Sequence, residues 1–289
     1  RKYFGTDGIR RIANTELTPE LVYKVAKAGA YVLSKHTDHA PTILIGRDTR
    51  ISGTLIESAM VAGFLSYGAN VKLLGVIPTP AVAYLTRKLQ ADASVVISAS
   101  HNTFEFNGIK YFSNKGMKIP DSLEEEIEEV MDSGKIDELT AVSSKIGISE
   151  YRQDLLDEYV YFFRKNFDDN FEKLNRDDFV VGIDTANGAT SVVAEKVFKA
   201  LGIKYKIINN SPDGININDN CGSTHLESLK KFVVENKLSL GVAYDGDGDR
   251  CLAVDENGNE IDGDMIMAIV SNYLRKKGKL AKDTVVATV

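Results

Sequence analysis

The sequence predicts an α/β protein made of tandem repeated α/β domains with mixed, mostly parallel sheets. One order of elements occurs twice along the 289 residues: a strand, a Gly-x-Asp-Thr turn, a helix, a glycine, a strand, a helix and a third strand. In both copies the third strand ends in a loop of polar residues. Alternating strands and helices favour parallel sheets, and a repeated order of elements indicates a repeated domain.

The first copy begins with a helix whose start is marked by Thr18 as N-cap and Pro19 in the first turn. A strand at 42–45 ends in the turn Gly46-Arg47-Asp48-Thr49, and Ser52 is expected to cap the next helix, which Gly68 ends. That helix is expected to bury Leu55, Ala59, Ala62 and Leu65. The remaining elements are a strand at 70–74, a helix at 81–89 and an apolar strand at 94–97.

Residues 98–110 follow that apolar strand and are expected to form a polar loop that ends in Asn107-Gly108-Ile109-Lys110. The acidic helix at 123–131 is expected to carry its charge run on a solvated face. Residues 132–150 have few apolar anchors and are typical of a domain edge.

The second copy comes after an aromatic-rich helix, Leu155 to Phe171, that is expected to bridge the two units. Its first strand, 179–184, ends in a second Gly-x-Asp-Thr turn. The other elements are a helix at 192–201, a strand at 205–208, a helix at 226–235 and a strand at 238–243.

A third unit is expected to begin with a hairpin-like segment after Arg250, followed by a helix from about Asp264 and a strand at 284–287. The predicted domains are therefore 1–150, 151–251 and 252–289. Because the chain starts without Met and stops inside an apparent strand, we expect it to be incomplete.

Composition excludes several classes of protein. A net charge of −6 without a basic stripe argues against general nucleic-acid binding. No apolar run is long enough to span a membrane, and no signal peptide opens the chain. Two cysteines cannot build a disulfide framework, so a cytoplasmic location is expected.

The loop Asp245 to Arg250, DGDGDR, is the candidate metal site. Two carboxylates about 4 Å apart repel by about 4 kcal/mol at an effective dielectric of 20, and a hard cation removes that repulsion. A solvated acidic turn is one alternative. A calcium-binding loop is another, but it needs glycine where this chain has Arg250. Arg250 could instead clamp a phosphate.

Ser100 is the candidate nucleophile, since it follows the apolar strand and has His101 beside it and Lys110 ten residues on. These groups suffice for a hydroxyl that accepts and passes on a phosphoryl group. A turn serine is the plain alternative. A serine hydrolase would need a Gly-x-Ser-x-Gly elbow, and Ala99 and His101 flank this serine.

Four basic residues in loops at strand ends would suit an anionic, phosphorylated substrate. They are Arg10, Arg47, Arg50 and Lys110.

Three motifs together resemble the α-D-phosphohexomutase superfamily: FGTDGIR at 4–10, SASHN at 98–102 with NGIK at 107–110, and DGDGDR at 245–250. The segments at 184–189 and 216–225 are similar to the members that act on phosphorylated amino sugars. The resemblance covers the whole chain and implies the phosphohexomutase architecture, with the first two domains and the start of a third.

The resemblance implies interconversion of glucosamine 6-phosphate and glucosamine 1-phosphate through a 1,6-bisphosphate, on the route to cell-wall precursors. It makes Ser100 the phosphoserine and a ligand of Mg²⁺, with His101 and Lys110 as acid/base candidates. Arg10 and Arg250 would hold the phosphoserine. The other implied ligands of Mg²⁺ are Asp245, Asp247 and Asp249. A homodimer formed through the first domain is also implied.

The chain departs from the family pattern at Arg11, Thr103, Phe106 and Leu226, where the family usually has Gly, Pro, an acid and Pro. The family's sugar-reading and last phosphate-binding loops would lie past Val289, so residues 1–289 alone are expected to bind Mg²⁺ weakly and not to turn over substrate. The rivals are a superfamily member acting on mannose or glucose phosphates, and a metal-binding fragment without catalysis.

Overall fold

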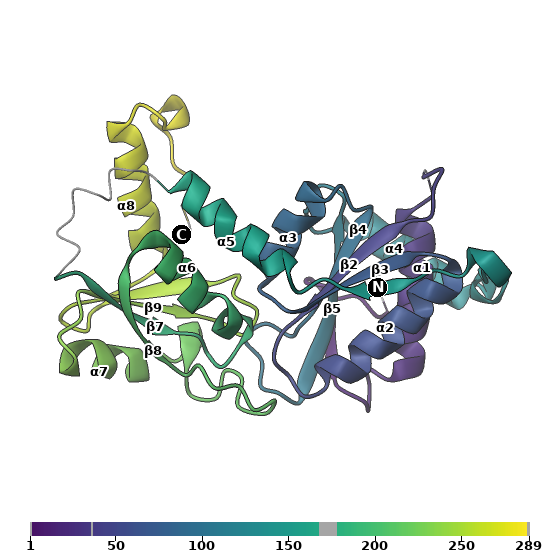
Figure 1. The fold of residues 1–289 in the computed structure, drawn as a ribbon, viewed down its shortest axis with the longest axis horizontal. Coiled ribbons are helices and arrows are strands. Elements are labelled where there is room, and N and C mark those ends of the chain that lie inside the picture. Colours follow the sequence, from purple (N-terminus) through teal and green to yellow (C-terminus); the bar gives the residue numbers. More distant parts are fainter. Residues whose placement is uncertain (1, 36, 168–177, 288–289) are drawn as a thin grey trace.

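The computed structural model of the protein describes residues 2–35, 37–167 and 178–287. It contains two β-sheets, which Figure 1 shows side by side with helices packed on their faces. Each sheet mixes parallel and antiparallel strands. The α/β class and the tandem repeat predicted from the sequence are confirmed.

The first sheet has six strands in the order β1-β5-β4-β2-β3-β6. The strands β4, β2, β3 and β6 are parallel to one another. At the other edge β5 runs antiparallel to β4, and β1 in turn runs antiparallel to β5. The strands are β1 (Ile9–Ile12), β2 (Thr42–Arg47), β3 (Asn70–Val76), β4 (Ala93–Ile97), β5 (Phe106–Ser113) and β6 (Ser149–Tyr151).

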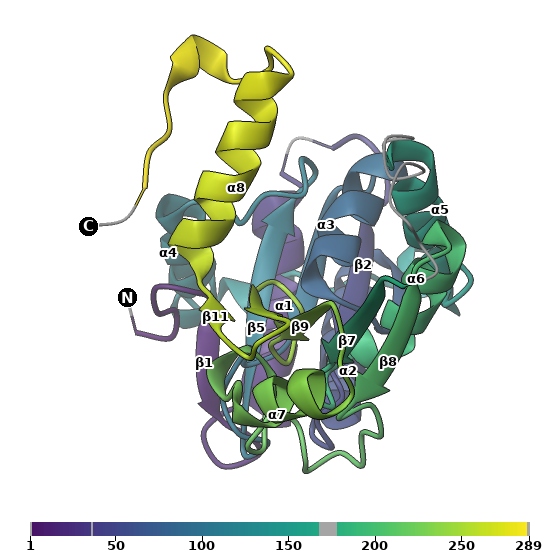
Figure 2. The same ribbon diagram turned by 90° about the vertical axis from the view of Figure 1, so that its left-hand side faces the viewer.

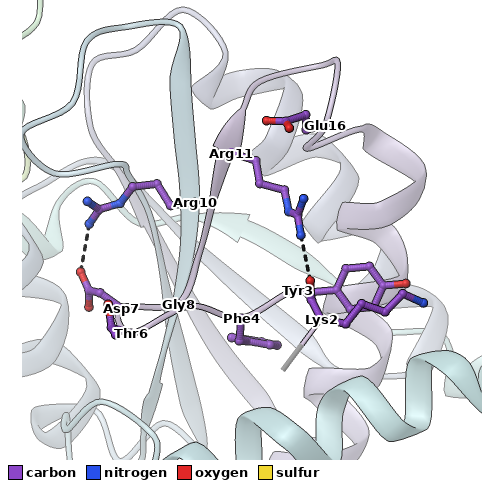
Figure 3. A pocket seen from close by; sticks show the side chains of 10 residues that line it. Lys2, Tyr3, Phe4, Thr6, Asp7, Gly8, Arg10, Arg11 and Glu16 are labelled. Carbon is purple, nitrogen blue, oxygen red and sulfur yellow. Dashed lines mark hydrogen bonds and ion pairs between the residues drawn. The ribbon is translucent and has the colours of Figure 1, made fainter.

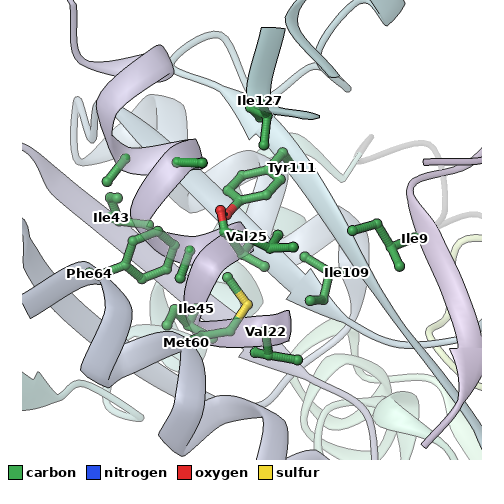
Figure 4. Packing of buried hydrophobic residues seen from close by; sticks show 14 of the residues in the cluster. Ile9, Val22, Val25, Ile43, Ile45, Met60, Phe64, Ile109, Tyr111 and Ile127 are labelled. Carbon is green, nitrogen blue, oxygen red and sulfur yellow. The ribbon is translucent and has the colours of Figure 1, made fainter. Parts of the chain in front are cut away.

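Helices cover both faces of this sheet. On one face lie α1 (Pro19–Leu33), α2 (Gly53–Tyr67) and α4 (Asp121–Asp132), and on the other α3 (Thr79–Lys88) and α5 (Leu155–Asn166). Successive side chains of a strand point to opposite faces, so Ile43 and Ile45 join the first core and Leu44 the second. Figure 4 shows the first core around Phe64 and Tyr111.

The second sheet has five strands in the order β11-β10-β9-β7-β8. Helix α7 (Glu227–Glu235) packs on one face and α6 (Ala194–Leu201) on the other. The strands are β7 (Val180–Asp184), β8 (Lys204–Ile208), β9 (Leu240–Tyr244), β10 (Cys251–Asp255) and β11 (Glu260–Ile261). Short 3₁₀ helices are η1 (Lys135–Glu138), η2 (Ser143–Lys145), η4 (Ala189–Val192), η5 (Gly222–Thr224) and η6 (Ala281–Asp283).

The two sheets have matching topology, because β4-β2-β3 in the first corresponds to β9-β7-β8 in the second. Both Gly-x-Asp-Thr segments lie at the end of the middle strand of each trio, with Gly46 and Arg47 still in β2 and Gly182 to Asp184 still in β7. The Ser100 loop follows β4 and the DGDGDR loop follows β9. These are the equivalent positions predicted from the repeat.

Helix α5 runs between the two sheets in Figure 1, as expected of a bridge, and it contacts both α3 and α6. The predicted C-terminal end of this helix, Phe171, lies outside the described residues. Helix α8 (Gly263–Lys276) extends away from both sheets in Figures 1 and 2 and buries none of its side chains.

Several expectations about local structure are wrong. The segment Asn107-Gly108-Ile109-Lys110 is not a loop but part of β5, because β1 and β4 flank it on both sides. Residues 284–287 form no strand, since no neighbouring strand pairs with them, and Val286 is 88% exposed. Ser52 lies at the start of α2 without making a side-chain cap.

The domain boundaries stay a prediction. Since β10 and β11 belong to the second sheet, we propose that the second unit runs to Ile261 and not to 251. Among the described residues, no helix is both long enough and apolar enough to cross a membrane.

Candidate active site

Ser100 lies at the carboxyl end of β4, where open α/β sheets place their ligands. Its side chain is buried, and its backbone has a φ of 54°, in the left-handed region that serine rarely occupies. The Ser100 N–H donates to Ser98 Oγ at 2.9 Å, and Ser98 Oγ donates to Asp48 Oδ2 at 2.6 Å. Such a conformation persists only where surrounding contacts hold it.

Arg50 supplies most of these contacts. Its side chain is fully buried and paired with Asp48 at 2.9 Å. It donates to the carbonyls of Ser100 at 3.0 Å, Asn102 at 2.9 Å and Phe106 at 3.1 Å, and also to that of Thr103. All of its donor groups are therefore used inside the protein. The expectation that Arg50 binds a substrate anion is wrong.

The DGDGDR loop faces Ser100 across the boundary between the two sheets. Ser100 Oγ donates a hydrogen bond of 2.6 Å to Asp245 Oδ2. The backbone of the loop also packs tightly against Ser100. A Cβ atom at Gly246 would lie only 2.5 Å from the Ser100 carbonyl oxygen, which is too close for any side chain. Only glycine permits this approach, so Gly246 serves the packing of the loop against Ser100, whereas a Cβ atom at Gly248 would meet Thr190 and Pro78.

Three carboxylates of this loop could hold a metal ion. Each of Asp245, Asp247 and Asp249 offers an oxygen, and these oxygens lie within 4.8 Å of one another. Asp247 Oδ1 is buried and has no hydrogen-bond partner among the described residues. Unpaired buried carboxylate oxygens are costly, and hard divalent cations prefer oxygen ligands. The residues present therefore fit a divalent cation.

Lys110 is the cation closest to these carboxylates. It extends from β5 and contacts Asp247 at 3.1 Å, Asp7 at 3.1 Å and Asp249 at 3.6 Å. Burial alone would lower the pKa of Lys110, but the three carboxylates outweigh burial and raise it.

The carboxylates of the loop have different pKa shifts. Burial and the neighbouring Asp247 raise the pKa of Asp245. Burial alone would raise the pKa of Asp247 as well, but the Lys110 ammonium and the Thr79 hydroxyl outweigh it and lower that pKa. Asp247 is therefore the more acidic of these two carboxyl groups, and burial together with the like charge of Asp247 makes Asp245 the less acidic one.

His101 and two arginines surround the Ser100 side of the site. Arg250 Nη1 lies 3.1 Å from His101 Nδ1. Burial lowers the pKa of His101, and the charges of Arg250 and Arg10 lower it further. Arg10 contacts Asp7 at 3.1 Å and Asn102 Oδ1 at 3.4 Å. The structure therefore brings the three aspartates and Lys110 together with Ser100, His101, Arg10 and Arg250. Arg47, which was also expected to suit an anionic substrate, instead pairs with Glu57 at 3.4 Å.

An open pocket of about 440 Å³ adjoins this region and is lined by residues 2–8, Arg10, Arg11 and Glu16. In Figure 3, Arg10 points toward Asp7, and Arg11 points to the other side of the strand toward the Lys2 carbonyl. Arg11 Nη2 donates to the Lys2 carbonyl at 2.9 Å, which ties the N-terminal segment to β1.

The comparisons with known proteins agree on the family. Residues 1–137 match the family Phosphoglucomutase/phosphomannomutase, alpha/beta/alpha domain I, and residues 157–258 match alpha/beta/alpha domain II of the same family. The two matches together cover well over half of the chain. The chain belongs to the phosphoglucomutase/phosphomannomutase family.

Among its relatives in this family are phosphoglucosamine mutases. That of Ruminiclostridium cellulolyticum is 52% identical over 288 residues, and that of Acetivibrio thermocellus is 54% identical over 290 residues. Each alignment covers 100% of this chain and 63% of the relative. The chain therefore spans less than two thirds of the length of these relatives.

Solved structures of phosphohexomutases share the fold. A phosphoglucomutase/phosphomannomutase family protein from Burkholderia thailandensis gives a TM-score of 0.78 at 22% identity, covering 95% of this chain and 59% of that one. Aspergillus fumigatus N-acetylphosphoglucosamine mutase, solved with GlcNAc-6P and magnesium, gives 0.57 at 16% identity, covering 97% and 56%. At these identities the likeness establishes the fold alone.

Three residues of the site were missed by the sequence reasoning. Asp7 contacts both Lys110 and Arg10, and its place inside the FGTDGIR motif could have pointed to it. Thr79 contacts the DGDGDR loop and Asn218 contacts the Ser100 loop, in each case from the opposite unit. We call these two loops the reactive loops. No local pattern marks Thr79, and although Asn218 lies in the family-like segment 216–225, that segment does not point to its partners. The partners of both residues lie more than a hundred residues away in the chain.

Proposed function

We propose that the protein is a cytoplasmic phosphoglucosamine mutase that interconverts glucosamine 6-phosphate and glucosamine 1-phosphate for UDP-N-acetylglucosamine and peptidoglycan precursor synthesis. The observation that carries the proposal is the 2.6 Å hydrogen bond from Ser100 Oγ to Asp245, which joins the nucleophile loop to the acidic loop. The names of relatives at about half identity over the whole chain support the choice of amino sugar.

Phosphorylated Ser100 is the phosphoryl donor in this account. In the first transfer the bond from Ser100 Oγ to phosphorus breaks, and a bond forms between phosphorus and a hydroxyl oxygen of the sugar monophosphate. The sugar hydroxyl loses a proton and the departing Ser100 oxygen takes one up, and His101 and Lys110 are the candidate groups for moving these protons. The bisphosphate turns over in the site, and the reverse step returns its other phosphoryl group to Ser100.

Five charged residues have further roles in the proposal. Arg10 and Arg250 hold the phosphate on Ser100, which suits guanidinium groups beside that loop. The proposed ligands of Mg²⁺ are the phosphorylated Ser100, Asp245, Asp247 and Asp249. When bound, Mg²⁺ supplies positive charge that offsets the charge developing on the transferred group. A homodimer is proposed as well, by analogy with the family.

The first prediction is that Ser100 carries the phosphate. The full-length protein, incubated with Mg²⁺ and glucose 1,6-bisphosphate, should gain the mass of one phosphoryl group, which peptide mapping should place on Ser100. Ser100→Ala should abolish the gain, whereas Ser113→Ala, at the half-buried end of β5, should not. Phosphate that persists in Ser100→Ala, or never appears in the wild type, would contradict the proposal.

The second prediction concerns the sugar. Steady-state rates of the full-length protein should be highest with glucosamine 6-phosphate, compared at equal concentration with mannose and glucose 6-phosphates. A protein restricted to residues 1–289 should show no turnover with any of them, because the relatives have further chain beyond the matched part. A preference for mannose phosphate would favour the rival assignment within the superfamily.

A further inference from the structure

The two reactive loops are held from opposite sides of the boundary between the sheets. Asn218, in the segment between β8 and α7, is buried, and its Nδ2 donates at 2.9 Å to the carbonyls of both Ser100 and Asn102. Its own backbone N–H donates to the Ala186 carbonyl at 2.9 Å. The second unit thus fixes Asn218, and Asn218 in turn holds the nucleophile loop of the first.

Thr79 does the same in the opposite direction. It lies at the start of α3 in the first unit, and its Oγ1 donates to Asp247 Oδ2 at 2.7 Å. Its backbone N–H donates to the Asp247 carbonyl at 2.9 Å. Two bonds to one residue fix both the backbone and the carboxylate, and they leave Asp247 Oδ1 unpaired and buried.

These contacts act on the groups whose geometry matters. Ser100 has a φ of 54°, and a backbone held in this region depends on its carbonyl contacts. Arg50 supplies contacts from within the first unit, and Asn218 is the donor that reaches the same two carbonyls from the second. Partners that orient metal ligands commonly change metal affinity or activity when removed.

We propose that Asn218 and Thr79 are positioning residues that act across the boundary, each setting the geometry of the reactive loop carried by the other unit. For the phosphoryl-transfer readout this inference rests on the proposed function. It goes beyond that function because it gives Asn218 the role of aligning Ser100 and gives Thr79 the role of aligning Asp247. Neither residue is assigned a contact with the substrate or the metal. The proposed roles also imply that the two units stay locked together while the reaction proceeds.

A matched control lies on the same boundary. Thr49 Oγ1 donates to the Asn187 carbonyl at 2.6 Å, so Thr49→Val removes a bond between the units without touching either reactive loop. A purely structural role for Asn218 and Thr79 predicts that all three variants behave alike. A positioning role separates Thr49→Val from the other two.

The Asn218 test is the rate of Ser100 phosphorylation in the full-length protein at saturating glucose 1,6-bisphosphate. Asn218→Ala, and Asn218→Leu as a variant of similar volume, should lower the maximal rate by roughly ten- to hundredfold, the scale expected for a misplaced reacting group. The concentration of donor at half-maximal rate should stay unchanged. Thr49→Val should keep the wild-type rate.

The Thr79 test is independent of turnover. Binding of Mn²⁺ to the full-length protein, followed by electron paramagnetic resonance, should weaken by roughly ten- to hundredfold in Thr79→Val. Thr79→Ser should restore the affinity, because it restores the hydroxyl donor. Thr49→Val should bind as the wild type does.

The outcomes distinguish the two levels of the account. A wild type that never accepts phosphate overturns the proposed function, while the Mn²⁺ arm still decides the role of Thr79. A phosphorylated wild type with unchanged rates in both Asn218 variants overturns the role of Asn218. Equal Mn²⁺ affinity in Thr79→Val and wild type overturns that of Thr79. Thermal unfolding of each variant shows that the compared proteins are folded.

Discussion

Arg50 shows at the scale of one residue how the loop that carries Ser100 is held. Its guanidinium lies with Asp48 in a fully buried pair, and it donates to four carbonyls of the segment that carries Ser100. Burial alone raises the pKa of Asp48, and the charge of Arg50 opposes that rise. Removing the arginine would therefore leave a buried carboxylate unpaired and the loop carbonyls without donors.

The third prediction is that Arg50→Ala lowers the free energy of unfolding by about 3–5 kcal/mol, the range for breaking a buried pair. Urea unfolding followed by circular dichroism measures it. Arg152→Ala, which removes a surface pair with Asp154, should change stability by less than about 1 kcal/mol. Equal effects of the two substitutions would contradict the role given to Arg50.

The sequence could not assign Arg50 its role. A guanidinium in a turn beside glycine and threonine is typical of an anion site, but the carbonyls that accept from Arg50 lie fifty or more residues away in the chain. The sequence could predict the metal site and the candidate nucleophile, because the residue types and their spacing along the chain indicate that chemistry. These residues are Asp245, Asp247, Asp249 and Ser100. The partners that orient them depend on the tertiary fold.

Helix α4 shows at the scale of an element that a charge run need not be solvated. The prediction of a solvated face is wrong for Glu124 and Glu128, which are both buried. Glu128 accepts hydrogen bonds of 2.7–2.8 Å from the backbone N–H groups of Lys2, Tyr3 and Phe4. The N-terminal segment, which carries Asp7 and Arg10, is thus tied to α4.

The fourth prediction is that acid loosens this segment. Burial alone would raise the pKa of Glu128, but the three backbone donors outweigh it and lower the pKa below its ordinary value of 4.5. A lowered folded-state pKa stabilises the fold above the unfolded pKa, and that stability is lost as pH falls through the folded pKa. Hydrogen-exchange protection of residues 2–4 should therefore fall below about pH 4.5.

Glu128→Gln should show the same loss of protection already at pH 7, since a neutral amide accepts these bonds less strongly. The exposed neighbour provides the control, because Glu129→Gln removes the same charge without a backbone partner among the described residues. Protection that is identical in both variants would contradict the assignment.

Helix α2 shows why the buried face of an apolar helix is hard to predict. The expected stripe is only partly buried, because Leu55 and Ala62 are exposed while Ala59 and Leu65 pack partly against the core. The fully buried face contains Ile56, Met60 and Gly63. The helix is apolar on several sides, so periodicity does not select one face. Packing against α1 does, because a Cβ atom at Gly63 would lie 2.6 Å from the Tyr23 carbonyl oxygen.

At the scale of the whole molecule, the repeat is what the sequence predicts well. Each copy contains its own strand period, turn and capping signals, and two copies reinforce each other. The antiparallel strand β5 was not predicted as a strand, because Asn107 and Gly108 favour turns, whereas pairing with β1 and β4 decides their conformation. The position of α8, which buries no side chain here, follows from no local pattern.

The arrangement of the two sheets also explains how distant motifs become one site. Strand β4 of the first sheet ends at the Ser100 loop, and strand β9 of the second sheet ends at the DGDGDR loop. The two loops meet across the boundary between the sheets, and hydrogen bonds run from each unit to the other. The sequence predicted that the two loops face each other from their equivalent places in the repeat. It could not predict the residues that hold them there.

The central claim is that one metal ion lies between the nucleophile and the acidic loop, and anomalous scattering from crystals soaked in Mn²⁺ tests it most directly. The fifth prediction is a single peak bonded at about 2.0–2.5 Å to carboxylate oxygens of Asp245, Asp247 and Asp249. The Ser100 oxygen, or the phosphate it carries, should complete the coordination. No peak among these carboxylates, or a Ser100 oxygen more than about 10 Å from it, beyond the reach of shared ligation, would contradict the account.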